Sequence, residues 1–300
     1  MSNLVINKRG GNMEILKIVD SKGQELILSK SRPFLLEGLS GIGLTSNISM
    51  MSGAFDGVNV TGINIKEKTL NITGSIVSST KGEMQKERAK LIGFLNPNKG
   101  AFKLIYKING HTKKLTVNIQ RVDFKESVLR MQKFQIQVLA PFPFWENVNE
   151  KRKEIALWTK DAYFPLVATK EKPIVFGHRV SNLICNIFND GDVETGMRIQ
   201  LKALATVINP SVLNIYTKEF IKIIQTLQVG DVLEITTYIN NKRIEVHKSD
   251  GTVKNVLNWM TLDSEFLQLK VGDNTFRYDA ESGIDNIEMT IYYNPATIGV

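Results

Sequence analysis

The sequence predicts a mainly β protein with two domains. Its 300 residues are about twice the length of a typical single domain. Apolar and polar side chains alternate over many short runs, as in strands with one buried face, and turn signals in the second half recur about every ten residues. We expect a β-rich first domain in residues 1–145, a connector in residues 146–181 and a β-sandwich in residues 182–300.

The composition is that of an ordinary folded chain, with 42% hydrophobic and 23% charged residues, which is too apolar for disorder. No apolar run approaches the ~18 residues of a membrane span, and the first residues do not read as a secretion signal. We therefore expect the chain to fold in a cytoplasm without membrane insertion. The one cysteine, Cys185, excludes an internal disulfide, and its alternating neighbours predict a buried thiol.

The first domain opens with a hairpin signal at residues 13–28, around the turn Asp20-Ser21-Lys22-Gly23. Six glycines in residues 38–62 then predict an irregular, mobile loop whose tip is residues 50–57. Met50, Met51 and Phe55 at this tip indicate a surface that becomes buried against a partner.

A helix is predicted between Lys81 and Asn96. Thr80 and Glu83 fit a capping box, and the Asn96-Pro97 pair ends the run. Four apolar residues recur at helical spacing: Met84, Leu91, Ile92 and Leu95.

Three alternating strands follow the helix, and an Asn109-Gly110 turn joins the first two. Their expected inward residues are Phe102, Leu104, Tyr106 and Ile108, then Leu115, Val117 and Ile119, then Phe134, Ile136, Val138 and Ala140. The domain ends at Pro141-Phe142-Pro143-Phe144-Trp145, because two prolines forbid a continuing central strand.

In the connector, the charge run Lys151-Arg152-Lys153-Glu154 and two prolines interrupt any regular pattern, although its aromatic residues indicate that it packs against something. Beyond it, Met197 to Val207 alternate cleanly. Residues 218–227 fit either a helix or a strand, and their isoleucines favour a strand.

Enzyme motifs are missing. Gly41-Ile42-Gly43-Leu44-Thr45-Ser46 lacks the third glycine of a dinucleotide fingerprint, and neither a phosphate-binding loop nor a nucleophile elbow occurs. His111, His178 and His247 have no partners at metal-ligand spacing. We expect no catalytic, cofactor-binding or metal site, and no enzyme activity.

Asp190, Asp192 and Glu194 imitate the start of a calcium loop. Thr195 and Leu201 stand where such a loop needs glycine and glutamate, so a β-turn between strands is the better interpretation.

Charge divides the chain. Residues 1–150 carry 21 Lys and Arg against 12 Asp and Glu, a net charge of +9, whereas residues 151–300 carry 17 against 18, a net charge of −1. The lysines are dispersed along the expected strands without an aromatic platform, which favours a solvated face over a nucleic-acid site.

The order of these elements resembles the distal tail proteins (Dit) of bacteriophages. The resemblance rests on a series of turns and strand ends: Phe55-Asp56-Gly57, Phe142-Pro143-Phe144-Trp145, Asn189-Asp190-Gly191-Asp192, Leu227-Gln228-Val229-Gly230-Asp231, the segment from Phe266 to Asn274 and the closing strand from Ile287 to Tyr293. Residues 1–12 precede the usual start of the family and are expected to be an extra arm that orders on assembly.

The resemblance implies a structural virion protein of the tail tip or baseplate. Its first domain would form a hexameric ring (belt) on the tail tube, and its second, galectin-like domain would hold hub, tail lysin or receptor-binding proteins. The basic first domain would then suit a ring lumen through which phage DNA passes.

Two other function classes stay open. The terminal sandwich could bind carbohydrate on a host surface, with Trp259 or Tyr278 as stacking faces, although either residue also suits a core. A glycosidase on a β-sandwich is the enzyme alternative.

Overall fold

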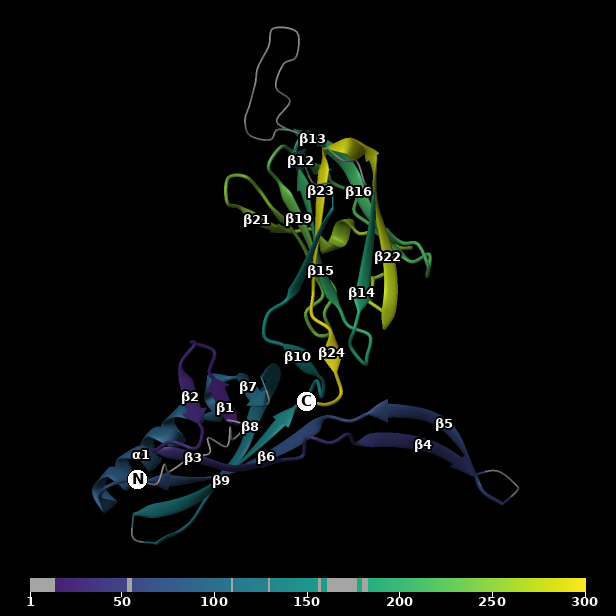
Figure 1. The fold of residues 1–300 in the computed structure, drawn as a ribbon. Helices are drawn as coiled ribbons and strands as arrows, with labels where there is room; N and C mark the ends of the chain where they lie inside the picture. The colour runs from purple at the N-terminus through teal and green to yellow at the C-terminus, as the bar shows by residue number, and fades with distance from the viewer. Residues whose placement is uncertain are drawn as a thin grey trace, which may run out of the picture. The chain divides into compact units, whose positions relative to one another are not determined.

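The computed structural model describes residues 14–52, 56–108, 110–128, 130–155, 158–160, 177–179 and 183–300. The chain forms two compact units (Figure 1): one holds residues 1–148 and 297–300, and the other holds residues 149–296. Strands dominate both units, and α1 (Lys81–Phe94) is the one α-helix among the described residues. The prediction of a mainly β fold with one short helix is confirmed.

The first unit is built around one large antiparallel sheet with the strand order β2-β1-β7-β8-β9-β6-β3. Its elements are β1 (Ile15–Val19), β2 (Glu25–Leu28), β3 (Phe34–Ser40), β4 (Ser46–Ser52), β5 (Val58–Ile65), β6 (Lys68–Val77), α1, a 3-10 turn (Pro97–Lys99), β7 (Phe102–Ile108), β8 (His111–Val128), β9 (Met131–Ala140) and β10 (Trp145–Asn147). Strand β10 pairs with β8 and with the short strand β24 (Ala296–Thr297).

Strand β8 is long enough to pair with β9 as well as with β7 and β10. It pairs with β7 up to Val117 and with β9 from Asn118 onward. A bridge between Ser29 and Leu35 joins the two ends of the strand order, and the Leu36 amide donates to the Ser29 carbonyl at 2.8 Å. The sheet therefore closes on itself, which leaves no long unpaired edge in this part of the unit.

The core of the first unit lies inside this closed sheet. The expected inward residues of β7, β8 and β9 are buried, except that Ile108 is half-buried. The capping box of α1 is present: the Glu83 amide donates to Thr80 Oγ1 at 3.2 Å, and the Thr80 amide donates to Glu83 Oε2 at 3.3 Å. Of the four apolar residues at helical spacing, Met84, Leu91 and Leu95 are buried, whereas Ile92 is half exposed, because only a narrow stripe of the helix faces the core.

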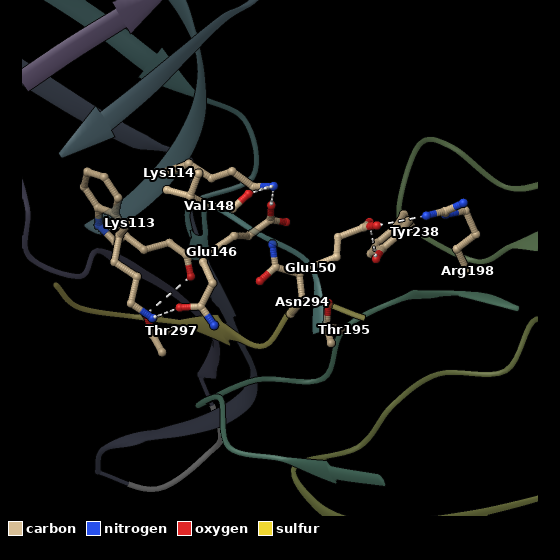
Figure 2. A network of polar contacts seen from close by, with 12 residues as sticks. Lys113, Lys114, Glu146, Val148, Glu150, Thr195, Arg198, Tyr238, Asn294 and Thr297 are labelled. Carbon is tan, nitrogen blue, oxygen red and sulfur yellow. Dashed lines mark hydrogen bonds and ion pairs between the residues drawn. The ribbon is translucent and has the colours of Figure 1, made fainter. Parts of the chain in front are cut away.

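The last residues of the chain belong to the first unit, beside β10. The Thr297 hydroxyl donates to the carbonyl of the fully buried Trp145 at 3.3 Å. Figure 2 shows Lys114 pointing toward both Glu146 and Val148; its ammonium lies 3.6 Å from the carboxylate and donates to the Val148 carbonyl at 3.4 Å. The first contact holds the C-terminal residues against β10, and the contacts of Lys114 hold β10 against β8.

The glycine-rich segment differs from the sequence prediction. Instead of an irregular loop over residues 38–62, the structure has β3 followed by a hairpin of β4 and β5, paired from Ser46 opposite Ile65 to Ser52 opposite Val58. Paired strands satisfy their backbone groups without a hydrophobic core, so glycine content alone does not exclude them. Of the expected tip, residues 53–55 lie outside the described residues.

The second unit is a sandwich of two antiparallel sheets. One has the order β11-β23-β15-β19-β20-β21, and the other has the order β14-β22-β16-β17 with β18 also paired to β16. The bounds are β11 (Lys151–Ile155), β12 (Trp158–Lys160), β13 (Gly177–Arg179), β14 (Ile184–Asn189), β15 (Met197–Ala203), β16 (Val207–Asn214), β17 (Phe220–Lys222), β18 (Thr226–Leu227), β19 (Val232–Thr236), β20 (Arg243–His247), β21 (Val253–Asn255), β22 (Gly272–Ser282) and β23 (Ile287–Tyr293), with 3-10 turns at Leu257–Trp259 and Ile284–Asn286. Alternate residues of both sheets, such as Ile199 and Phe276, meet in one core.

Two segments of this unit bear on the sequence analysis. The charge run at residues 151–154, which we expected in a connector without regular structure, lies in the edge strand β11. Charged side chains are usual on edge strands, because they discourage pairing with other chains. Residues 218–227 contain β17 and β18, so the preference for strand is confirmed.

Buried asparagines organise the turns of the second unit. Asn189 is 1% exposed; its amide donates to the carbonyls of Val193 and Leu269, both at 3.1 Å, and its oxygen accepts from the Gly191 amide at 3.0 Å. A Cβ on Gly191 would lie 2.5 Å from the Ala296 carbonyl, so only glycine fits there. The contact from the Gly191 amide to the Asn189 side chain is an Asx turn, and it follows the end of β14.

We expect Asn189→Ala to lower the free energy of unfolding of the second unit by about 2–3 kcal/mol, because it removes the amide that donates to the Val193 and Leu269 carbonyls and leaves the buried Gly191 amide without its acceptor. Asn258→Ala, at an exposed asparagine of the same unit, is the control. Urea unfolding followed by circular dichroism measures both. Equal stability of the two variants would contradict the role given to Asn189.

Candidate functional site

The hairpin of β4 and β5 carries an apolar face that no described residue of the first unit's core covers. Directly opposed residues share a face, and the pairs Ile48–Ile63 and Met50–Val60 are opposed. Val58 and Ile65 extend the same face at its two ends. The opposite face is mostly polar. We call the face formed by Ile48, Met50, Val58, Val60, Ile63 and Ile65 the hairpin patch.

A β-bulge makes the hairpin patch continuous. Val60 and Ile63 are three residues apart, and an odd spacing puts side chains on opposite faces of a regular strand. The pairing slips by one residue between Ser49 and Met50, so Thr61 is the extra residue, and its hydroxyl donates to the Ser49 carbonyl at 3.2 Å. The bulge therefore returns Val60 and Ile63 to one face.

The hairpin patch is exposed to a degree that is unusual for large apolar side chains. Val60 is 56% exposed, Met50 58% and Ile63 65%. A two-stranded hairpin without packing on either face is marginally stable in water. Contiguous exposed apolar surface of this kind marks an interaction site.

A polar cavity of about 340 Å³ lies at the base of the hairpin, within the first unit, where Gly41, Gly43 and Lys68 contribute to its lining. The ammonium of Lys68 donates to the Ile298 carbonyl at 3.0 Å and lies 5.9 Å from the centre of the Trp145 ring. Burial lowers the pKa of Lys68. The base of the hairpin is thus tied to the C-terminal residues, and the apolar face extends beyond it.

The positive charge of the first unit is distributed over the outward side of its sheet. Lys103 and Lys107 on β7 alternate with buried residues, and Lys133 on β9 does the same. Some outward lysines are paired, such as Lys17 with Glu25 at 3.0 Å. This arrangement fits the solvated face that the sequence favours.

The aromatic, cysteine and histidine residues that the sequence raised as candidates lie on different elements of the structure. Tyr278 is in the core of the second unit, whereas Trp259 is 38% exposed, with the Lys254 ammonium 4.5 Å from the ring centre. Cys185 is buried and free, as predicted. His111 begins β8 and His247 ends β20.

Residues 1–12 and the side chain of His178 lie outside the described residues. Among those that are described, α1 is too short and too polar to span a membrane.

From the sequence we expected a partner-binding surface at Met50, Met51 and Phe55, but not the hairpin patch as a whole. Met50 belongs to the patch, Met51 lies on the other face of β4, and Phe55 lies outside the described residues. Alternation is present on each side of the bulge, in Val58 and Val60 and again in Ile63 and Ile65. Two short runs of alternating apolar and polar residues, shifted by one residue relative to each other, indicate a strand with a β-bulge.

Comparisons with known proteins cover most of the chain. Residues 21–140 match the family model of the phage tail protein RIFT-related domain, and residues 190–296 match that of the siphovirus-type tail component, C-terminal domain. No curated protein sequence matches significantly.

Among solved structures, the Dit protein of phage SPP1 aligns with a TM-score of 0.66 and 12% identity over 94% of this chain and 98% of its own. A chain of the phage P2 baseplate in its activated conformation with calcium aligns with a TM-score of 0.59 and 12% identity, over 97% of this chain and 100% of its own. A chain of the phage p2 baseplate in its activated conformation with strontium aligns with a TM-score of 0.58 and 13% identity, over 96% of this chain and 99% of its own. At these identities, the similarity is one of fold.

Burial raises the pKa of Cys185 to about 11, against a smaller opposing effect of Lys153. The thiolate is therefore scarce at pH 8, and we expect a disulfide reagent to label folded Cys185 at least about 100-fold more slowly than the protein in guanidinium chloride. Ellman's reagent measures both rates, with glutathione as a reference thiol. Equal rates in the two states would contradict the burial.

Proposed function

Because the chain belongs to the family of bacteriophage distal tail proteins, and is thus a structural component of a phage tail, we propose that it forms a hexameric ring at the end of the tail tube. The family models describe tail components in both units. We propose a structural role without catalysis, in a virion tail tip that assembles in the host cytoplasm.

The observation that carries the proposal is the hairpin patch. A closed ring uses head-to-tail contacts, in which one surface of each copy meets a different surface of the next. The hairpin patch supplies an apolar surface from an element that adds nothing to its own core, as an assembly contact requires. We propose that it packs on the first unit of the neighbouring copy.

The same proposal covers the other partners. The first unit would bind the tail tube, and the second unit would attach hub, tail lysin or receptor-binding proteins of the baseplate. The excess of Lys and Arg in residues 1–150 and the outward lysines of β7 and β9 support a ring lumen that passes DNA.

Carbohydrate binding by the second unit is the alternative. Exposed Trp259 lines an open, mostly apolar depression with Ile224, Asn258 and Met260, which would suit stacking of a sugar ring. A glycan array probed with the full chain and with Trp259→Ala tests it. Binding of a glycan that is lost in the variant would favour this function, and an array without binding would remove it.

We expect six copies of 33.7 kDa, about 202 kDa, for the native protein in sedimentation analysis. The double variant Val60→Thr and Ile63→Thr should shift this mass toward the monomer. Burial of each apolar side chain stabilises the contact by about 1.5–3 kcal/mol. If the double variant loses about 2 kcal/mol or more of binding free energy per subunit contact, the dissociation constant of that contact rises at least about 30-fold.

The matched control is Met51→Thr, which changes an equally exposed residue on the other face of the hairpin and should keep the hexamer. Circular dichroism of each variant checks that the fold is intact. A hexamer that persists in the double variant, or dissociates equally in the control, would remove the hairpin patch from the interface.

A further inference from the structure

The outward face of the six-stranded sheet brings two glutamates and a histidine together. On β19 and β20, Glu234 lies directly opposite Glu245, and His247 follows two residues later on the same strand face. The neighbours Leu233, Ile235, Ile244 and Val246 point into the core. One oxygen or nitrogen atom from each of Glu234, Glu245 and His247 lies within 4.8 Å of the other two.

The carboxylate of Glu234 has closer polar partners than that of Glu245. Glu234 accepts hydrogen bonds from Gln200 at 2.8 Å and from Arg198 at 3.3 Å. Arg198 is itself shared with Glu150, toward which it points together with Tyr238 in Figure 2.

Glu245 has no hydrogen bond from a side chain among the described residues. The Arg243 Nε atom is 3.7 Å from its carboxylate, and the His247 Nε2 atom is 3.9 Å away. Both distances exceed hydrogen-bond length. Like charges directly opposite each other destabilise a sheet, and Arg198 beside Glu234 and Arg243 beside Glu245 offset part of this repulsion. A cation bound by both carboxylates would also offset it.

The imidazole of His247 places a ring nitrogen beside these carboxylates. Its Nε2 atom is enclosed and lacks a hydrogen-bond partner among the described residues, although the side chain as a whole is 40% exposed. An enclosed nitrogen without a partner is costly. Two ligands of one zinc ion are separated by roughly 3.4 Å in a tetrahedral arrangement and by about 4.2 Å in line, and the 3.9 Å between His247 and Glu245 falls between these limits.

We propose that Glu234, Glu245 and His247 form a binding site for a divalent transition-metal ion of the zinc class. One imidazole and two carboxylates suit zinc, whereas calcium requires six or more oxygen ligands. The side chains of Glu245 and His247 are 22% and 40% exposed, so solvent reaches this part of the sheet face. Water, or a side chain from a bound partner, would complete the coordination.

The test is titration of the full chain with zinc chloride by isothermal calorimetry. We expect one zinc ion per chain and a dissociation constant at least about tenfold weaker in His247→Gln and in Glu245→Gln. His111→Gln, at an exposed histidine of the first unit, should bind like the native protein. Calcium chloride should give no binding.

A second readout is thermal unfolding, because an ion that binds only the folded state raises the melting temperature. Zinc should stabilise the native protein and His111→Gln but not the two site variants, whose fold is checked without metal by circular dichroism. Absence of zinc binding to the native chain would overturn the proposal. Zinc binding that is unchanged in both site variants would overturn it as well.

Discussion

Strand β8 pairs with β7 through its first half and with β9 through its second half, and the first unit depends on this shared pairing. Its residues Leu115, Val117 and Ile119 face the core, so a slip of one residue would turn all three toward solvent. The bridge between Ser29 and Leu35 then closes the strand order.

The hairpin of β4 and β5 lies outside that closed sheet, and this separation links the fold to the proposed function. Its backbone is paired internally, but its apolar face has no core to join. The bulge at Thr61 keeps Val60 and Ile63 on that face. In the proposed ring, this surface is available to a neighbouring copy without disturbing the core of either.

The sequence predicted those elements whose signals come from residues close together in the chain. Thr80 and Glu83 predicted the start of α1, and the alternation of Phe102, Leu104 and Tyr106 predicted a buried face. The sequence did not predict features that depend on how strands pair with one another. The bulge hid the hairpin patch, and β11 was missed because the charges of an edge strand resemble those of a loop. Glu234 and His247 meet only through the register of β19 and β20.

The central claim is that the hairpin patch joins neighbouring copies in a ring, and a cryo-electron microscopy reconstruction of the purified full-length protein tests it most directly. We expect a six-fold ring in which Met50, Val60 and Ile63 of each copy are buried against the first unit of the next. A monomer, or a ring in which these side chains remain in solvent, would contradict it.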